Sequence, residues 1–242
     1  VLAYYLASPF NSLVIFYEKE NFIILFHLLV ALKLIMSGVT FTVFLYYRFN
    51  NKIGMGFSTL LSLGFALAQY NIAQSSNIMW LDGVYLLPLI LLGVYKLVKK
   101  KRVVLLAISV ALSLLFNWYT GCINCLFSAA WLLYEIALEK NVNLKEFFSM
   151  IGRYAISMIL GILMSCAVFF PSILSLLSGR GNANWKIFNL GMVGNPASAV
   201  VDYELGGVSD VRSVSLYVGC LAMLGVLMFF FSRNIRPKEK VA

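Results

Sequence analysis

Charged side chains are scarce in this sequence, and acidic ones most of all. Only 12% of the 242 residues are charged and 10 are acidic, whereas 61% are hydrophobic and the mean hydropathy is +0.87. Soluble domains carry charge on about a quarter of their residues, so this composition excludes an ordinary soluble domain and predicts a membrane protein. The net charge is +9, but the sequence contains no cluster of basic and aromatic residues of the kind that binds nucleic acids. We therefore interpret the excess positive charge as the charge that sets membrane topology.

Motifs of soluble enzymes are also missing. The sequence contains no Walker loop, GxSxG, HExxH or dinucleotide fingerprint, so an ATP-driven reaction would need a partner protein. Cys122 and Cys125 form a CxxC in an apolar stretch without a second ligand pair. We interpret both as packing residues rather than zinc ligands. No cofactor is evident and no metal site is predicted from the residues themselves.

Long apolar runs organise the chain. A spanning helix needs about 20 mostly apolar residues, and Pro171 predicts a kink or break in one of the runs. We expect an all-α polytopic membrane helix bundle, forming a single transmembrane domain over residues 1–242. It has about seven membrane segments, which cover residues 21–47, 55–73, 80–97, 103–117, 119–137, 148–178 and 214–232.

The lysines and arginines orient these segments. When residue 20 is placed outside the cell and the segments alternate, most basic residues fall on the cytoplasmic side, including the KKKR run at 99–102. Cytoplasmic loops carry such an excess. The polar stretches then lie outside the cell, at residues 8–21, 74–82, 116–121 and in a long extracytoplasmic loop at 179–213.

Lys33 and Asp82 are the charged residues most in need of an explanation. Lys33 lies near the middle of segment 21–47, where an unpaired ammonium costs at least about 2.5–3.5 kcal/mol. We therefore expect it to face the bundle interior with a partner, either as a structural ion pair or at a phosphate or substrate cavity. Asp82 either starts a helix, where a carboxylate is favoured, or belongs to an extracytoplasmic site for a headgroup, sugar or metal.

Two further features lie near the same outer surface. Asn117, Trp118 and Tyr119 place an amide beside aromatic rings, which suits sugar or isoprenoid recognition and equally suits an interfacial aromatic belt. His27, the only histidine, is a candidate for the lining of an outer-leaflet cavity, although a lone histidine is more often a hydrogen-bonded interior residue.

Four stretches resemble the bacterial YfhO family. They are YYLASPFN at 4–11, LVALKLIMSGVTFTVFLYYRF at 29–49, AQYNIAQSSNIMWLDGVYLLPLILLGVYKL at 68–97 and LSLLFNWYTGCINCLFSAAWLLYE at 112–135. The resemblance covers roughly the first 140 residues and weakens beyond them. It implies a GT-C-like glycosyltransferase that transfers a sugar outside the cell from a polyprenyl-phosphate donor to an envelope polymer such as lipoteichoic acid. The residues that it places in shared motifs, and for which it implies substrate binding, are Lys33, Asn77, Trp80, Asp82, Asn117 and Tyr119.

The resemblance also implies a catalytic acid that the chain does not show. Enzymes of the GT-C type carry an acidic residue, a general base or metal-associated acid, in their first extracytoplasmic loop. The chain begins at Val1, at what resembles the end of that loop. We therefore expect that acid, and any divalent metal it holds, to belong to an upstream segment, and the fragment alone to be inactive.

The resemblance further implies partners and a location, and it leaves other functions open. The expected partners are a polyprenyl-phosphate sugar donor, an envelope polymer acceptor and the lipids of a bacterial cell membrane. One alternative is a transporter or flippase of lipid-linked substrates, which Lys33 and the Pro171 region fit. Another is a non-catalytic scaffold of envelope synthesis.

Overall fold

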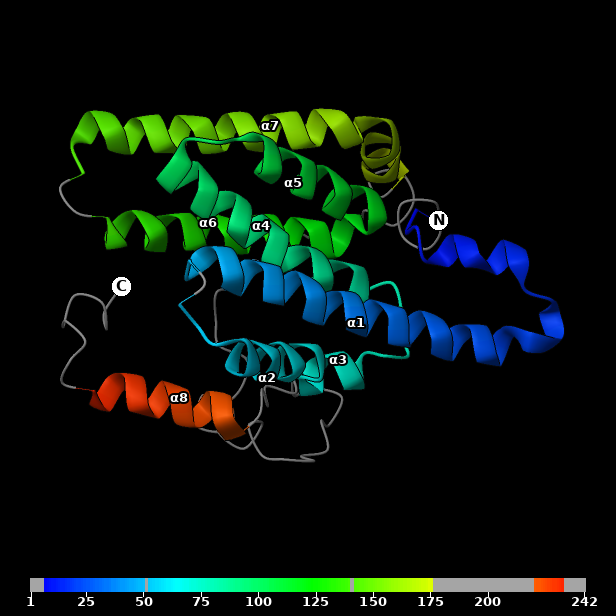
Figure 1. The fold of residues 1–242 in the computed structure, drawn as a ribbon. Helices are drawn as coiled ribbons and strands as arrows, with labels where there is room; N and C mark the ends of the chain where they lie inside the picture. Colours follow the sequence, from blue (N-terminus) through cyan, green and yellow to red (C-terminus); the bar gives the residue numbers. More distant parts are fainter. Residues whose placement is uncertain (1–6, 51, 140–141, 176–219, 233–242) are drawn as a thin grey trace, which may run out of the picture.

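The computed structural model describes residues 7–50, 52–139, 142–175 and 220–232 (Figure 1). Within these ranges the regular elements are helices, and no strand occurs, so the predicted all-α bundle is confirmed. Two short 3₁₀ helices, η2 (Asn11–Phe16) and η3 (Lys19–Asn21), come first. The α-helices are α1 (Phe22–Arg48), α2 (Met55–Ala66), α3 (Gln69–Ala73), α4 (Leu81–Lys100), α5 (Val104–Phe116), α6 (Trp118–Leu138), α7 (Leu144–Ser175) and α8 (Cys220–Phe231).

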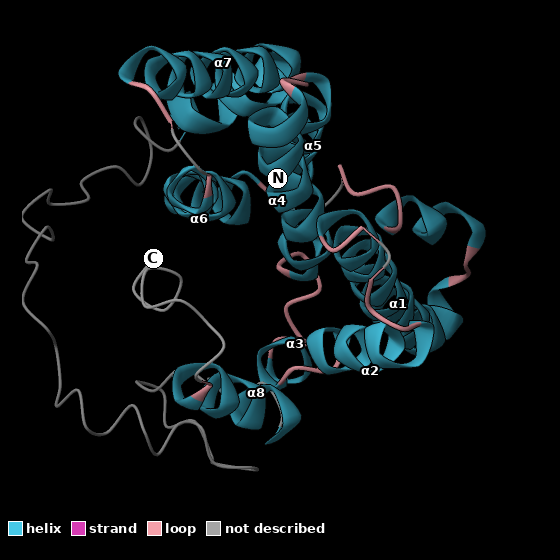
Figure 2. Cartoon of the chain, turned by 60° about the vertical axis from the view of Figure 1, so that its left-hand side comes forward, coloured by secondary structure: helices cyan, strands magenta, loops and turns pink. Residues whose placement is uncertain are grey.

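Helix α4 is the centre of the packed part of the bundle. Helix α1 packs on one side of it and carries α2 on its own surface, while α5 and α6 pack on the other side and α7 covers α5 (Figure 2). The faces that α4, α5 and α6 turn toward one another form the main hydrophobic core, which includes Ile90, Val94, Val110 and Leu132. Gly93 permits this packing, since a Cβ there would lie 2.7 Å from the Cα of Leu106.

Helices α1 and α4 run in the same direction but do not start at the same level. Lys33 of α1 contacts Asp82 in the first turn of α4, and Arg48 at the end of α1 lies over Tyr95. Lys33 is 11 residues after Phe22, or roughly 16 Å along the helix. The first three turns of α1 therefore extend past the start of α4, and η2 and η3 lie beside this extension (Figure 1).

The expectation of seven membrane segments is wrong in number. Within the described residues, four helices are long and apolar enough to span a membrane. They are Lys19–Arg48, Leu81–Lys100, Trp118–Leu138 and Leu144–Leu174.

Helix breaks account for the difference. The apolar run at 55–73 is divided at Leu67 and Ala68, which leaves α2 with 12 residues, and α5 has 13. Helices of these lengths cover about 18–20 Å, less than the hydrocarbon thickness of about 30 Å. Of the run at 214–232, the structure describes the 12-residue helix α8 and the residue after it.

Of the kink or break predicted at Pro171, the break does not occur: α7 continues through the proline to Ser175. The proline lies four residues before the end of the helix, so only one late carbonyl, that of Ala167, loses its usual donor. The neighbouring Ser172 hydroxyl donates to the Val168 carbonyl at 2.8 Å. The loop predicted at 179–213 lies outside the described residues.

The two ends of the bundle differ in charge. One end, called here the basic end, holds the end of α1, the turn between α4 and α5, and the start of α7. Its lysines and arginines are Arg48, Lys52, Lys96, Lys99, Lys100, Lys101, Arg102 and Lys145. At the other end, the loop before α4, the start of α4 and the start of α6 come together near Asp82, and we call this the motif end.

Candidate functional site

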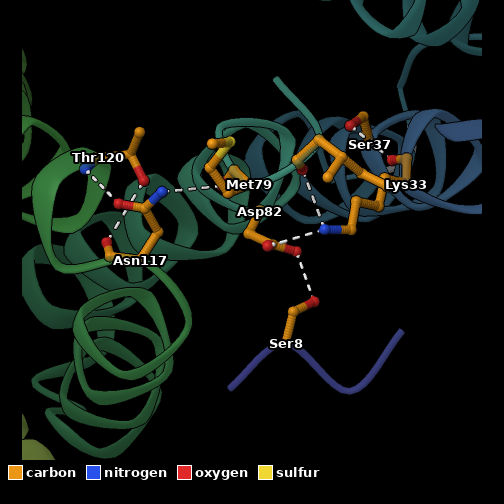
Figure 3. Close-up of polar contacts among 8 residues, drawn as sticks. Ser8, Lys33, Ser37, Met79, Asp82, Asn117 and Thr120 are labelled. Carbon is orange, nitrogen blue, oxygen red and sulfur yellow. Dashed lines mark hydrogen bonds and ion pairs between the residues drawn. The ribbon is translucent and has the colours of Figure 1, made fainter. Parts of the chain in front are cut away.

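Asp82 is held from two directions at the motif end. The Ser8 hydroxyl donates to its Oδ1 at 2.7 Å, and the Lys33 ammonium donates to its Oδ2 at 2.9 Å (Figure 3). The same ammonium donates to the Ile78 carbonyl at 3.0 Å. Three chain segments, namely the N-terminal stretch, α1 and the loop before α4, therefore meet at one carboxylate.

This ion pair is fully enclosed by protein. The side chain of Lys33 is 0% exposed and that of Asp82 is 1% exposed. Burying two charges is unfavourable unless each keeps good partners, and here both carboxylate oxygens and the ammonium are hydrogen-bonded. The expectation that Lys33 faces the bundle interior with a partner is confirmed, although the partner lies in the first turn of α4 rather than near a helix middle.

Asp82 does not cap α4 through its side chain. The N-cap position is held by Trp80, which makes no side-chain cap hydrogen bond, and the carboxylate oxygens of Asp82 accept from Ser8 and Lys33. Its negative charge still lies in the first turn, where the helix dipole favours it. The helix-start interpretation of Asp82 thus holds for the charge but not for hydrogen bonding.

The N-terminal stretch is fixed to α4 by a second contact. Tyr85, nearly one turn after Asp82, is buried, and its ring meets that of Phe10 edge-on with centroids 5.8 Å apart. Ser8 is itself 1% exposed. The SPFN sequence therefore packs against the start of α4 with a polar and an aromatic contact.

Asn117 has a structural role that accounts for all of its side-chain bonds. Its Oδ1 accepts from the backbone N–H groups of Tyr119 and Thr120, which caps α6. Its Nδ2 donates to the Met79 carbonyl at 3.0 Å (Figure 3). Asn124, about two turns further along α6, donates to the Gly83 carbonyl at 2.9 Å. Together these amides tie the start of α6 to the start of α4.

The other three predicted residues lie at the surface of the motif end. Asn77 and Trp80 are partly exposed, and Tyr119 is 48% exposed. Tyr70 of α3 lies near Tyr119: burial raises the pKa of the Tyr70 hydroxyl, and the Tyr119 hydroxyl adds to that effect. We call Tyr70, Asn77, Trp80 and Tyr119 the rim.

The six residues predicted to bind substrate thus form two sets. Lys33, Asp82 and Asn117 are internal and bonded to protein groups, whereas Asn77, Trp80 and Tyr119 are accessible. In this structure only the accessible set can touch a substrate directly. Substrate binding by all six stays a prediction.

Sequence reasoning missed Ser8, Tyr70 and Asn124. Ser8 belongs to a family-like stretch, but nothing in its spacing pointed to a residue 74 positions away. Asn124 lies inside an apolar run, where a buried amide needs partners, so that signal was available.

The remaining candidates lie away from this site or inside the core. His27 is exposed on α1, with its ring edge-on to Phe26. Cys122 and Cys125 pack against the main hydrophobic cluster, as interpreted from the sequence. Among the described residues, no group of three or more His, Cys, Asp or Glu could hold a metal ion.

The family profile described as bacterial membrane protein YfhO matches residues 1–242. The chain belongs to the YfhO family. No curated protein and no solved structure matches it. The family match extends well past the first 140 residues that carry the resemblance. Within this YfhO chain, all four family-like stretches supply residues to the motif end, namely Ser8, Lys33, Asp82 and Asn117.

Proposed function

We propose that this YfhO protein transfers a sugar outside the cell, from a polyprenyl-phosphate donor to an envelope polymer such as lipoteichoic acid. The observation that carries the proposal is the convergence of four family-like stretches at the end of the bundle opposite the basic end. Basic ends face the cytoplasm, which orients the motif end outward. Lipid-linked sugars present their reacting carbon at that surface.

The rim supplies the groups that suit such a substrate. Trp80, Tyr119 and Tyr70 offer aromatic faces at the motif end, which also carries the Asn77 amide, and aromatic rings pack well against sugars and isoprenoid chains. The internal set supports the rim, because Lys33 holds the Ile78 carbonyl and Asn117 holds that of Met79. The segment that carries Asn77 and Trp80 is therefore fixed from both sides.

Transfer to an acceptor hydroxyl also needs a base and support for the leaving phosphate. Asp82 is a poor base here, because its oxygens accept from Ser8 and Lys33. It does not fit a divalent metal either, since the ammonium 2.9 Å away repels a second cation. We assign the base to neither Asp82 nor any other described residue.

Transfer itself is the first test of this function. The intact protein in proteoliposomes is supplied with a radiolabelled polyprenyl-phosphate sugar and lipoteichoic acid, and label in the polymer is counted. Tyr119→Leu should slow transfer by about 2–10-fold, the range expected for loss of one aromatic contact. Tyr46→Leu, which changes a tyrosine of similar exposure, 51% against 48%, at the basic end, should leave it unchanged.

Two results would contradict the proposal. Equal transfer rates in Tyr119→Leu and Tyr46→Leu would mean that the rim does not bind the substrate. Movement of labelled lipid between leaflets without any label in the polymer would favour the flippase alternative, which a buried membrane ion pair also suits.

Orientation is tested separately by cysteine labelling in whole cells. In a background without the native cysteines, Ser76→Cys at the exposed motif end should react with an impermeant maleimide. Lys100→Cys, exposed at the basic end, should react only after the membrane is permeabilised, because basic loops face the cytoplasm. The reverse pattern would place the rim inside the cell.

A further inference from the structure

A second cluster of polar and aromatic groups lies at the basic end, between α1 and α4. The Lys96 ammonium lies 4.2 Å from the centroid of the Tyr47 ring, and the Arg48 guanidinium lies 5.0 Å from that of Tyr95. Each helix thus places a cation on a tyrosine of the other. Such contacts position cations without neutralising them.

The turn after α4 brings more positive charge to the same place. The backbone N–H groups of Lys101 and Arg102 donate to the carbonyls of Leu97 and Lys96, at 3.1 and 3.3 Å. The bond from Lys101 to Leu97 spans four residues, which is the αL motif, and this motif favours glycine at the left-handed position. Here that position is Lys101, with φ 56°, so the turn keeps an unbroken basic run despite the steric cost.

The positive charge at this turn is not balanced. Lys96 lies within electrostatic range of Lys100 and Arg102. The two carboxylates nearby are already paired, Glu135 with Arg48 at 2.8 Å and Glu139 with Lys99 at 2.5 Å. Across the described ranges, no carboxylate lies within ion-pair distance of Lys96, Lys100 or Arg102.

General rules explain only part of this arrangement. Lysines in the last turn of α4 complement the helix dipole, and basic loops set membrane topology. Both effects are satisfied by cations that spread apart into solvent. Neither requires Lys96 to lie close to both Lys100 and Arg102, where the like charges repel one another unless an anion lies between them.

We propose that Lys96, Lys100 and Arg102 bind the phosphate of an anionic phospholipid in the cytoplasmic leaflet. Lys96 lies in a helix long enough to span the membrane, and the neighbouring Tyr46, Tyr47 and Phe49 are exposed aromatics. Aromatic residues of this kind mark the membrane interface, and adjacent basic clusters attract anionic headgroups. The site is separate from the rim and does not depend on sugar transfer.

Lipid binding to the purified intact protein tests this site. Phosphatidylglycerol is titrated into the detergent-solubilised protein, and bound lipid is counted by native mass spectrometry. Lys96→Gln and Arg102→Gln should each weaken binding about fivefold, the effect of one cation at a lipid surface. Lys96→Arg keeps the charge and should bind as the wild type does. Lys145→Gln removes one exposed charge from α7 at the same end and should have no effect.

Three outcomes would overturn the proposal. Equal weakening in Lys145→Gln would mean a diffuse charge effect rather than a site. Unchanged lipid binding in Arg102→Gln would also overturn it. Arg102 is exposed and lies outside α4, so the protein should fold with this substitution. Displacement of the lipid by a large molar excess of inorganic phosphate would assign the cluster to a free anion.

Discussion

Lys33→Leu is expected to lower the free energy of unfolding by about 3–5 kcal/mol. The substitution leaves the Asp82 carboxylate 1% exposed with a single remaining donor, Ser8, and frees the Ile78 carbonyl. Lys33→Leu with Asp82→Leu should recover much of this loss, because replacing both partners of a buried pair removes the uncompensated charge. Denaturant unfolding of the purified protein measures all three free energies.

An exposed ion pair provides the matched control. Lys99 and Glu139 also pair between helices, but their side chains are 40% and 22% exposed. Lys99→Leu should therefore cost only about 0–1 kcal/mol. If Lys33→Leu cost no more than Lys99→Leu, or if the double variant were as unstable as the single one, burial of the Lys33–Asp82 pair would be refuted.

Helical class and membrane location could be predicted from the sequence, but helix ends could not. The apolar composition excludes a soluble domain, and this conclusion does not depend on where the individual helices begin and end. The run at 55–73 shows the limit: Leu67 and Ala68 are as apolar as their neighbours, yet Ala68 has ψ 145°, outside the helical range. Hydropathy measures solvent preference and contains no information about such a backbone turn.

The need for a partner at Lys33 could be predicted, but the partner could not. The energetic cost of an unpaired ammonium is local information, whereas Asp82 is 49 residues away and is chosen by the packing of α1 on α4. Asn117 is the opposite case. An asparagine directly before an apolar run is a helix-start signal, so its capping role could have been predicted from the sequence. The adjacent aromatic residues instead favoured an interpretation as a binding site.

The arrangement gives Asp82 a specific task within the proposed function. It joins the N-terminal stretch through Ser8 to the rim segment through Lys33 and the Ile78 carbonyl. Asp82 would then act as a positioning residue, which aligns two parts of a site without touching substrate.

Asp82→Asn is therefore expected to slow transfer by about 10–100-fold, the effect of misplacing reacting groups by about 1 Å. The amide keeps an oxygen for Ser8 but removes the charge that pairs with Lys33, so the protein should still fold while the N-terminal stretch and the rim lose their common anchor. The loss should appear mainly in kcat, because the rim residues that contact substrate are unchanged. Steady-state kinetics on the reconstituted protein, with unfolding measured in parallel, separates these effects. Transfer at the wild-type rate would return Asp82 to a purely structural role, whereas complete loss in a folded protein would make it a group that takes part in the reaction.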